Sequence, residues 1–135
     1  MNLIKVLYND ACGDWSFSDE FFSEEFIHIF KNRYNINLEG YTNSYRYDPR
    51  VIELFEELGS KKSSHEYASL KTTMYPEEWI DCMYIQVFEG REHIVFSRDK
   101  AYKKLLEEMI SARSVTDKNI EMYNSINDVY NKYRL

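Results

Sequence analysis

The sequence contains only four glycines, two prolines and two cysteines, and each scarcity excludes a class of site. The glycines form neither a GxGxxG nor a GxxxxGKS/T pattern, so no loop that wraps nucleotide phosphates is indicated. Cys12 and Cys82 stand alone without a CxxC pair, and the three histidines show no HxxxH or HxH spacing. Isolated ligands of this kind argue against a zinc site. We therefore expect no metal and no cofactor.

Long hydrophobic runs are also absent from the sequence. No segment approaches the roughly 20 apolar residues of a membrane span, and the first residues do not resemble a signal peptide. Unpaired cysteines suit a reducing compartment. These observations predict an intracellular protein that does not contact a membrane.

The composition predicts a folded chain with an acidic first half. Of the 135 residues, 44% are apolar and 30% are charged, which is typical of a globular protein with a real core. Residues 1–60 carry 11 acidic and 5 basic side chains, whereas residues 61–135 carry 12 of each. An acidic chain repels phosphate backbones, so nucleic-acid binding would need a local basic patch such as Lys100, Lys103 and Lys104.

Apolar periodicity and turn residues predict the elements of an α+β protein. In chain order, we expect a strand at 2–8, a helix at 18–33, a helix at 48–59, a polar linker at 60–66, strands at 69–75, 79–88 and 93–96, and helices from 97 and from 116 onward. The helix at 48–59 has the clearest signals, with Asp48 as N-cap, Pro49 in the first turn and Gly59 at its end. The predicted fold is a small, mostly antiparallel sheet with helices packed on one face. We expect residues 1–112 to form a single domain, with the helix at 113–135 docked on it or used to bind a partner.

The sequence offers one candidate nucleophile and no complete catalytic set. Cys12 is expected between the first strand and the first helix, where a helix N-terminus lowers the pKa of a thiol. The acidic neighbours Asp14, Asp19 and Glu20 oppose thiolate formation, however, and nothing selects a base among the histidines. We assign no catalytic residue, and an enzyme that uses Cys12 as its nucleophile stays open as an alternative.

Aromatic residues and one arginine are concentrated in segments predicted as loops. Interfaces favour exposed Trp, Tyr and Arg, which makes Trp15, Tyr45 and Arg46 candidates for partner contact. The alternative is that these rings cover the edge of a small core. The predicted binding residues are Cys12, Gly13, Trp15, Tyr45, Arg46 and Asp48.

Three separated signatures resemble an uncharacterised protein family of large DNA viruses and phages. The first runs from Asn9 through Cys12-Gly13 and Trp15 to Ser18; the second runs from Arg46 through Asp48-Pro49 to Glu57-Leu58-Gly59; the third comprises Leu70, Pro76, Ile85 and the segment 89–94. The resemblance covers about residues 3–96. It implies a viral origin and supplies no activity.

Together these observations predict a non-enzymatic accessory module that binds a host or viral protein. The expected location is the host cytoplasm, and packaging in the virion is left open. A nucleic-acid-associated factor that uses the segment 98–104 is a further alternative. The sequence does not determine the oligomeric state.

Overall fold

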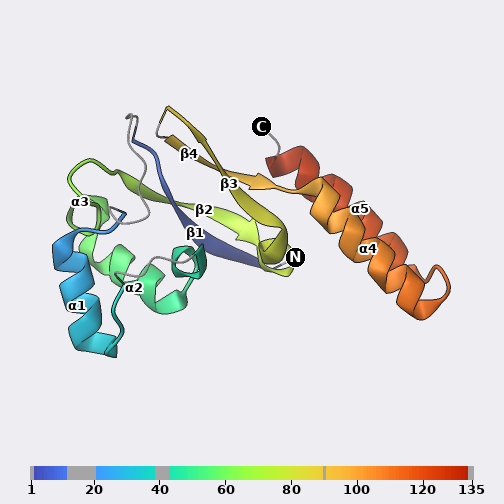
Figure 1. The fold of residues 1–135 in the computed structure, drawn as a ribbon, viewed down its shortest axis with the longest axis horizontal. Coiled ribbons are helices and arrows are strands. Elements are labelled where there is room, and N and C mark those ends of the chain that lie inside the picture. Colours follow the sequence, from blue (N-terminus) through green and yellow to red (C-terminus); the bar gives the residue numbers. More distant parts are fainter. Residues whose placement is uncertain (1, 12–20, 39–42, 90, 134–135) are drawn as a thin grey trace. The chain divides into compact units, whose positions relative to one another are not determined.

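The computed structural model describes residues 2–11, 21–38, 43–89 and 91–133. The elements in chain order are β1 (Leu3–Asn9), α1 (Glu24–Tyr34), η1 (Asn43–Arg46), α2 (Pro49–Leu58), α3 (Ser60–Ser63), β2 (Leu70–Pro76), η2 (Glu77–Cys82), β3 (Met83–Phe88), β4 (Arg91–Phe96), α4 (Arg98–Ala112) and α5 (Asp117–Tyr133), as drawn in Figure 1. The α+β class is confirmed. The strands form two antiparallel pairs, β1 with β2 and β3 with β4.

The α2 helix begins and ends as its sequence predicts. The side chain of Asp48 accepts a hydrogen bond from the backbone N–H of Arg50 at 2.9 Å, and Pro49 occupies the first helical position. Gly59 follows Leu58, the last residue of the helix, and has φ 84°, a backbone conformation that residues other than glycine rarely adopt. The cap at one end and the glycine at the other therefore set the helix length.

Three boundaries differ from the predicted ones. The α1 helix begins at Glu24, because Ser23 is its N-cap and accepts from the N–H of Phe26 at 3.0 Å. The predicted start at 18 lies outside the described residues. The predicted linker contains the short helix α3, and the first part of the predicted strand 79–88 belongs to the 3₁₀ segment η2. Trp79 and Cys82 are both buried there, and the backbone kinks at Trp79, with φ −112° and ψ 18°.

The chain divides into two compact units. The N-terminal unit contains Leu3–Tyr75 and Val87–His93, and the C-terminal unit contains Met1–Asn2, Pro76–Gln86 and Ile94–Leu135. The boundary at residue 112 expected from the sequence stays a prediction. Helices α4 and α5 belong to the same unit because they pack along each other.

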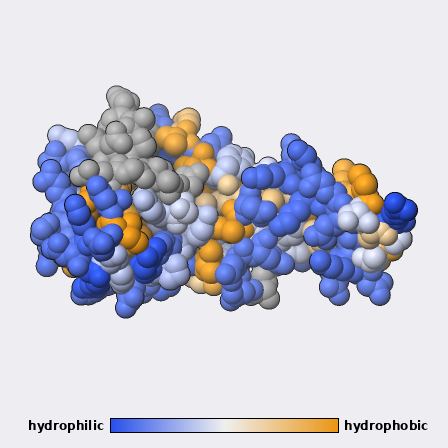
Figure 2. Space-filling model, turned by 60° about the horizontal axis from the view of Figure 1, so that its bottom comes forward, coloured by the Kyte–Doolittle hydropathy of each residue, from blue (hydrophilic) through white to orange (hydrophobic). Residues whose placement is uncertain are grey.

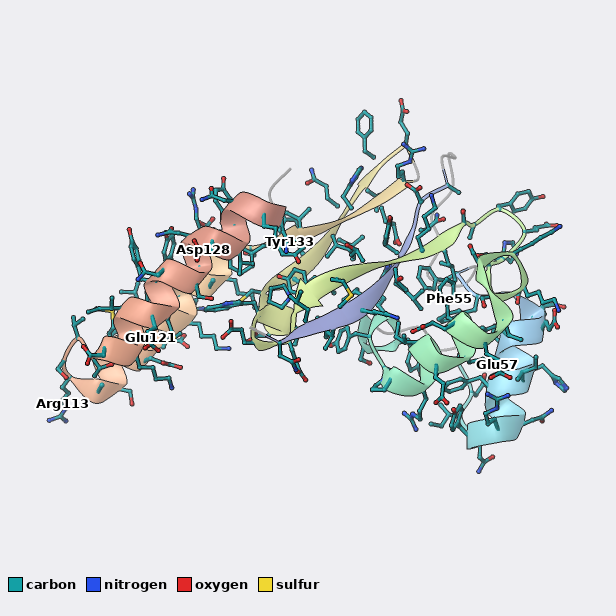
Figure 3. All side chains as sticks on the ribbon, turned by 180° about the vertical axis from the view of Figure 1, so that it is seen from behind. Phe55, Glu57, Arg113, Glu121, Asp128 and Tyr133 are labelled. Atoms are coloured by element: carbon teal, nitrogen blue, oxygen red, sulfur yellow. The ribbon has the colours of Figure 1, made fainter. Side chains whose placement is uncertain are left out.

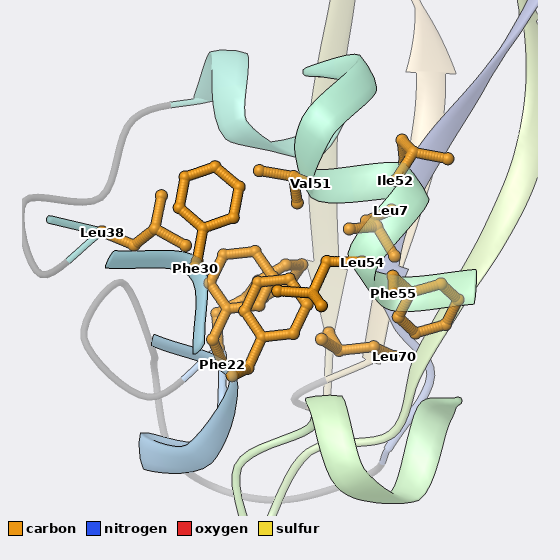
Figure 4. Packing of buried hydrophobic residues seen from close by; sticks show 11 residues of the cluster. Leu7, Phe22, Phe30, Leu38, Val51, Ile52, Leu54, Phe55 and Leu70 are labelled. Atoms are coloured by element: carbon orange, nitrogen blue, oxygen red, sulfur yellow. The ribbon is translucent and has the colours of Figure 1, made fainter. Parts of the chain in front are cut away.

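Aromatic rings from α1 and from the two residues before its N-cap build much of the core of the N-terminal unit. The rings of Phe22 and Phe26 stack at 4.5 Å between centroids, and those of Phe26 and Phe30 follow at 6.2 Å. Figure 4 shows Phe22 and Phe30 facing Val51 and Leu54 of α2. The full cluster comprises Leu7, Phe21, Phe22, Phe26, Phe30, Leu38, Val51, Ile52, Leu54, Phe55 and Leu70. Burial of these large side chains ties α1 and α2 to β1 and β2.

The C-terminal unit has a smaller interior centred on Trp79. The Trp79 ring meets Phe96 edge-on at 5.9 Å, and its indole N–H donates to the Ser125 hydroxyl at 2.9 Å. Ala101 and Leu105 of α4 are buried in this unit, as are Ile126 and Val129 of α5. A capping box opens α5, in which the N–H of Asn119 donates to Thr116 Oγ1 and the N–H of Thr116 donates to Asn119 Oδ1. The helix predicted from 116 onward is thus present, with Thr116 as part of its cap.

Candidate functional site

Of the six residues predicted to bind a partner, the structure describes three. Cys12, Gly13 and Trp15 lie outside the described residues. Tyr45 and Arg46 belong to η1, and Asp48 is the N-cap of α2. Tyr45 is half-buried and packs against the aromatic core, so the alternative in which a ring covers the core edge describes this residue better.

Arg46 is buried, and the prediction that it is exposed is wrong. Its side chain is 5% exposed and that of its partner Glu92 is 9% exposed. The guanidinium donates to both carboxylate oxygens of Glu92, at 2.8 and 2.7 Å, and also to the carbonyl oxygen of Leu7 at 3.2 Å. It lies 4.8 Å from the centre of the Phe21 ring. A buried charge requires such a partner, and the sequence alone did not indicate that Glu92, 46 residues away, would supply it.

Asp48 also has a structural role. Its carboxylate forms an ion pair with Arg50 at 2.7 Å besides capping α2. Hydrogen bonds from the Arg50 side chain and from backbone N–H groups hold the pKa of Asp48 below its usual value. The side chain is therefore already engaged within the chain.

The register of β1 leaves half of one strand edge open. At the ends of the β1–β2 pair, the N–H of Asp10 donates to Ser69 O at 2.8 Å and the N–H of Glu77 donates to Asn2 O at 2.9 Å. In an antiparallel ladder, these bonds mean that the backbone N–H and C=O groups of the even-numbered residues of β1 point toward β2. The backbone N–H and C=O groups of the odd-numbered residues point away from it. Consistent with this register, Leu7 O and Asn9 N bond to Arg46 and Glu92 on the opposite edge.

The open half of this edge is at Lys5. Its backbone N–H and C=O point away from β2, and no hydrogen bond to either group is found within the described part of the chain. Unpaired backbone groups on a strand edge can pair with another extended chain. The Arg46–Glu92 pair occupies the edge at Leu7 and Asn9, so among the described residues of β1 the open part runs from Leu3 to Lys5.

A groove with mainly apolar walls lies beside this open edge. Its volume is about 410 Å³, and it is lined by Ile4 and Lys5 of β1, by Tyr47, and by Pro49, Ile52, Glu53 and Glu56 of α2. Neighbouring side chains on a strand point to opposite faces, so a groove lined by both Ile4 and Lys5 runs along the strand edge. We refer to these seven residues as the β1–α2 groove.

The rim of the β1–α2 groove is acidic. Lys5 Nζ pairs with Glu56 Oε1 at 2.9 Å, which neutralises one carboxylate. Glu53 is exposed and has no ion-pair partner among the described residues. The groove therefore combines apolar walls, one excess negative charge and an open strand edge.

Sequence reasoning did not identify the β1–α2 groove. The sequence signals for α2 were Asp48, Pro49 and Gly59 at its ends, and no stripe on the surface of this helix was predicted. Pro49, Ile52, Glu53 and Glu56 are spaced at three and four residues, which places them on one side of a helix. This spacing is the signal that could have found the α2 wall, while the contribution of β1 depends on tertiary packing.

The described residues show no arrangement for metal or thiol chemistry. They contain no group of three or more His, Cys, Asp or Glu side chains that could hold a metal ion. Cys82 is buried, and burial together with the adjacent Asp81 raises the pKa of its thiol to about 11. The Cys82 thiol is therefore protonated at neutral pH.

Comparison of this chain with known proteins found no similar protein. The chain matches no family model, no curated protein and no solved structure. Among the residues described, no helix has the length and apolar character needed to cross a membrane.

Proposed function

We propose that this protein is an interaction module that binds an extended segment of a partner protein as an added strand on β1. The observation that carries the proposal is the backbone of Lys5 beside the β1–α2 groove, for which the described residues supply no hydrogen-bond partner. Strand addition of this kind derives affinity from main-chain hydrogen bonds and specificity from side-chain pockets. The non-enzymatic role expected from the sequence is kept, and the contact surface moves from Arg46 to the groove.

The length of the open edge limits the interaction. The partner strand can pair with the segment Leu3–Lys5, because Arg46 and Glu92 occupy the next positions of the edge. A residue opposite Lys5 would exchange two backbone hydrogen bonds with it. A pairing this short predicts a dissociation constant in the micromolar range, on the order of 1–100 µM.

The walls and the rim indicate the side chains of the partner segment. Ile4, Tyr47 and Ile52 favour one large apolar side chain inside the groove. Glu53 favours a Lys or Arg next to it, since this carboxylate has no cation of its own among the described residues. The proposed partner is therefore a host or viral protein with an extended apolar and basic segment.

Selection from a phage-displayed library of random peptides tests this proposal. We expect enrichment of peptides that combine an apolar residue with Lys or Arg. Fluorescence anisotropy then compares the selected peptides on the wild-type protein, on Glu53→Lys and on the matched variant Glu66→Lys, which reverses an exposed charge outside the groove. Binding should weaken about tenfold or more for Glu53→Lys and stay near the wild-type value for Glu66→Lys.

Methylation of single backbone nitrogens in a selected peptide tests the strand geometry. Methylation removes a donor, so it should abolish binding at the residue that pairs with Lys5 and have little effect at the residues on either side. Equal sensitivity at consecutive positions would contradict strand addition. Enriched peptides that bind the wild type and Glu53→Lys equally would show that the groove is not their site.

A further inference from the structure

The α4–α5 hairpin presents a second surface, independent of the β1–α2 groove. The two helices are antiparallel, with Arg113 at the loop end and Tyr133 at the other, as Figure 3 shows. Their inner sides carry the buried residues Ala101 and Leu105 of α4 and Ile126 and Val129 of α5. The hairpin is therefore already packed along one side of each helix.

One outer face of the hairpin is lined by interactions between aromatic and polar residues. The rings of Tyr102 and Tyr123 stack at 6.2 Å, and the Tyr102 hydroxyl donates to Asn127 Oδ1 at 3.0 Å. The Arg98 guanidinium lies 4.2 Å from the centre of the Tyr130 ring. These contacts place Arg98 and Tyr102 of α4 on the same face as Tyr123, Asn127 and Tyr130 of α5.

Four large apolar side chains continue this face toward the loop and are left in solvent. Leu106 and Ile110 are 55% and 74% exposed, and Ile120 and Tyr123 are 52% and 50% exposed. Leu106 and Ile110 follow Tyr102 at intervals of four residues, so they lie on the same side of α4. We refer to Tyr102, Leu106, Ile110, Ile120 and Tyr123 as the hairpin face. Figure 2 shows that hydrophilic residues dominate the visible surface, with apolar residues gathered in separate areas, one of them near the loop end of this hairpin.

The charges beside the hairpin face are arranged symmetrically about Leu106. Asp99 lies seven residues before Leu106 and Arg113 lies seven residues after it. Seven residues return a helix to nearly the same side, with a drift of about 20°, so Asp99 lies close to the side of Leu106. Arg113 is the residue that caps the C-terminal end of α4, with a left-handed backbone at φ 57°. Both charged residues are exposed, and neither forms an ion pair within the described part of the chain. The N-terminal end of α4 therefore carries a negative charge and the cap at its C-terminal end a positive one.

We propose that the hairpin face is covered by a second copy of this chain, with the two α4 helices antiparallel across a two-fold axis at Leu106. This arrangement places Leu106 against its own counterpart and Tyr102 against Ile110 of the second copy. It also brings Asp99 of each copy to Arg113 of the other. A two-fold interface must be complementary to itself, and both the apolar spacing and the charge order of α4 meet that condition.

The residues around the hairpin face favour a second copy over a lipid surface. Helices that lie on membranes carry Lys and Arg along the polar side next to the apolar face. Here the exposed residues of the two helices carry both signs: the acidic Asp99, Glu107 and Glu121 are interspersed with the basic Lys100, Lys103 and Lys118. The acidic residues would oppose an anionic membrane, whereas Asp99 finds a cation in the antiparallel pair.

Sedimentation velocity on the full chain tests the proposal. We expect a concentration-dependent shift from the 16.3 kDa monomer to a species of twice that mass. Leu106→Lys should raise the dissociation constant at least about tenfold, because it places a charge at the centre of the contact. Val87→Lys, the same change at an exposed residue of β3, should leave the dissociation constant near the wild-type value. Both positions are exposed, so we expect each variant to fold. Circular dichroism melts check this expectation.

Charge reversal decides the register. Asp99→Arg alone and Arg113→Asp alone should each weaken the dimer, and the double variant should restore it, because both new pairs are again of opposite sign. Arg113 has φ 57°, which Asp also tolerates. A chain that stays monomeric at all concentrations would overturn the proposal and leave the face to a different protein. A dimer unaffected by Leu106→Lys, or a double variant that does not recover, would overturn it as well.

Discussion

Arg46 and Glu92 form two parallel hydrogen bonds between segments that lie 46 residues apart in the sequence. The guanidinium also donates to Leu7 O, and the carboxylate also accepts from the N–H of Asn9 at 2.7 Å. The pair thus holds η1 and β4 to the same edge of β1. It occupies one half of that edge and leaves the half at Lys5 open, which defines where an added strand could bind.

Breaking the buried pair should strongly destabilise the N-terminal unit. Glu92→Gln removes the negative charge and leaves Arg46 buried without its counter-charge, at a cost of about 3–5 kcal/mol in the free energy of unfolding. Urea unfolding measures this cost. Glu57→Gln breaks the exposed Arg33–Glu57 pair and is the control, for which we expect almost no change. Similar losses for the two variants would contradict the structural role of Arg46.

The contribution of Asp48 should depend on pH. Asp48→Ala removes the N-cap of α2 and should cost about 1 kcal/mol at neutral pH. The pKa of Asp48 is lowered in the folded protein, mainly by Arg50, so its charge stabilises the fold above the unfolded pKa of about 3.9. That stabilisation is lost as the pH falls through the folded value.

Asp48→Asn separates the charge of Asp48 from its cap, because Asn also caps helices well. We expect the difference in unfolding free energy between the wild type and Asp48→Asn to shrink as the pH falls from neutral through the pKa of Asp48. Urea unfolding at several pH values measures it. A difference that stays constant down to the lowest pH would show that the charge contributes nothing.

Gly59 should not tolerate a side chain, although space is available. A Cβ built on Gly59 meets no atom within 4 Å, so crowding is not the reason. The backbone has φ 84° and ψ 166°, a region that is essentially restricted to glycine. Gly59→Ala should therefore lower the free energy of unfolding by about 1–3 kcal/mol. Thermal melts can compare it with Lys61→Ala in α3, and an unchanged melting temperature for Gly59→Ala would contradict the strain argument.

Cys82 should be inert toward alkylation in the folded protein. Its thiol is buried, and burial with the nearby Asp81 raises its pKa to about 11, so the reactive thiolate is scarce at neutral pH. Iodoacetamide labelling followed by peptide mass spectrometry should modify Cys82 slowly in buffer and rapidly in urea. Peptide mapping separates this signal from that of Cys12. Equal labelling rates under both conditions would show that the Cys82 site opens readily.

Local sequence signals predicted the elements that depend on neighbouring residues. Asp48, Pro49 and Gly59 lie within or next to α2, so the helix could be located without any tertiary information. The start of α1 was predicted too early, because the segment at 18–20 carries the same kind of cap residues as Ser23 and no local rule chooses between them. The η2 segment was read as strand because its apolar residues also fit an extended chain.

The candidate site was harder to predict, because its parts come from distant segments. The α2 wall of the β1–α2 groove has a helical spacing that is visible in the sequence. The β1 wall and the open edge at Lys5 depend on which strand pairs with β1 and on what covers the other edge. Strand pairing is a non-local property, and a shift by one residue would exchange the two edges.

The sequence by itself determined the α+β class, the caps of α2 and α5, and an acidic first half, because caps, periodicity and charge act over a few residues. Tertiary structure decided that Arg46 is enclosed with Glu92 and that the backbone of Lys5 has no partner among the residues that the structure describes. A buried charge needs a partner that only folding can bring near, and an edge is open only where the fold supplies no neighbouring strand.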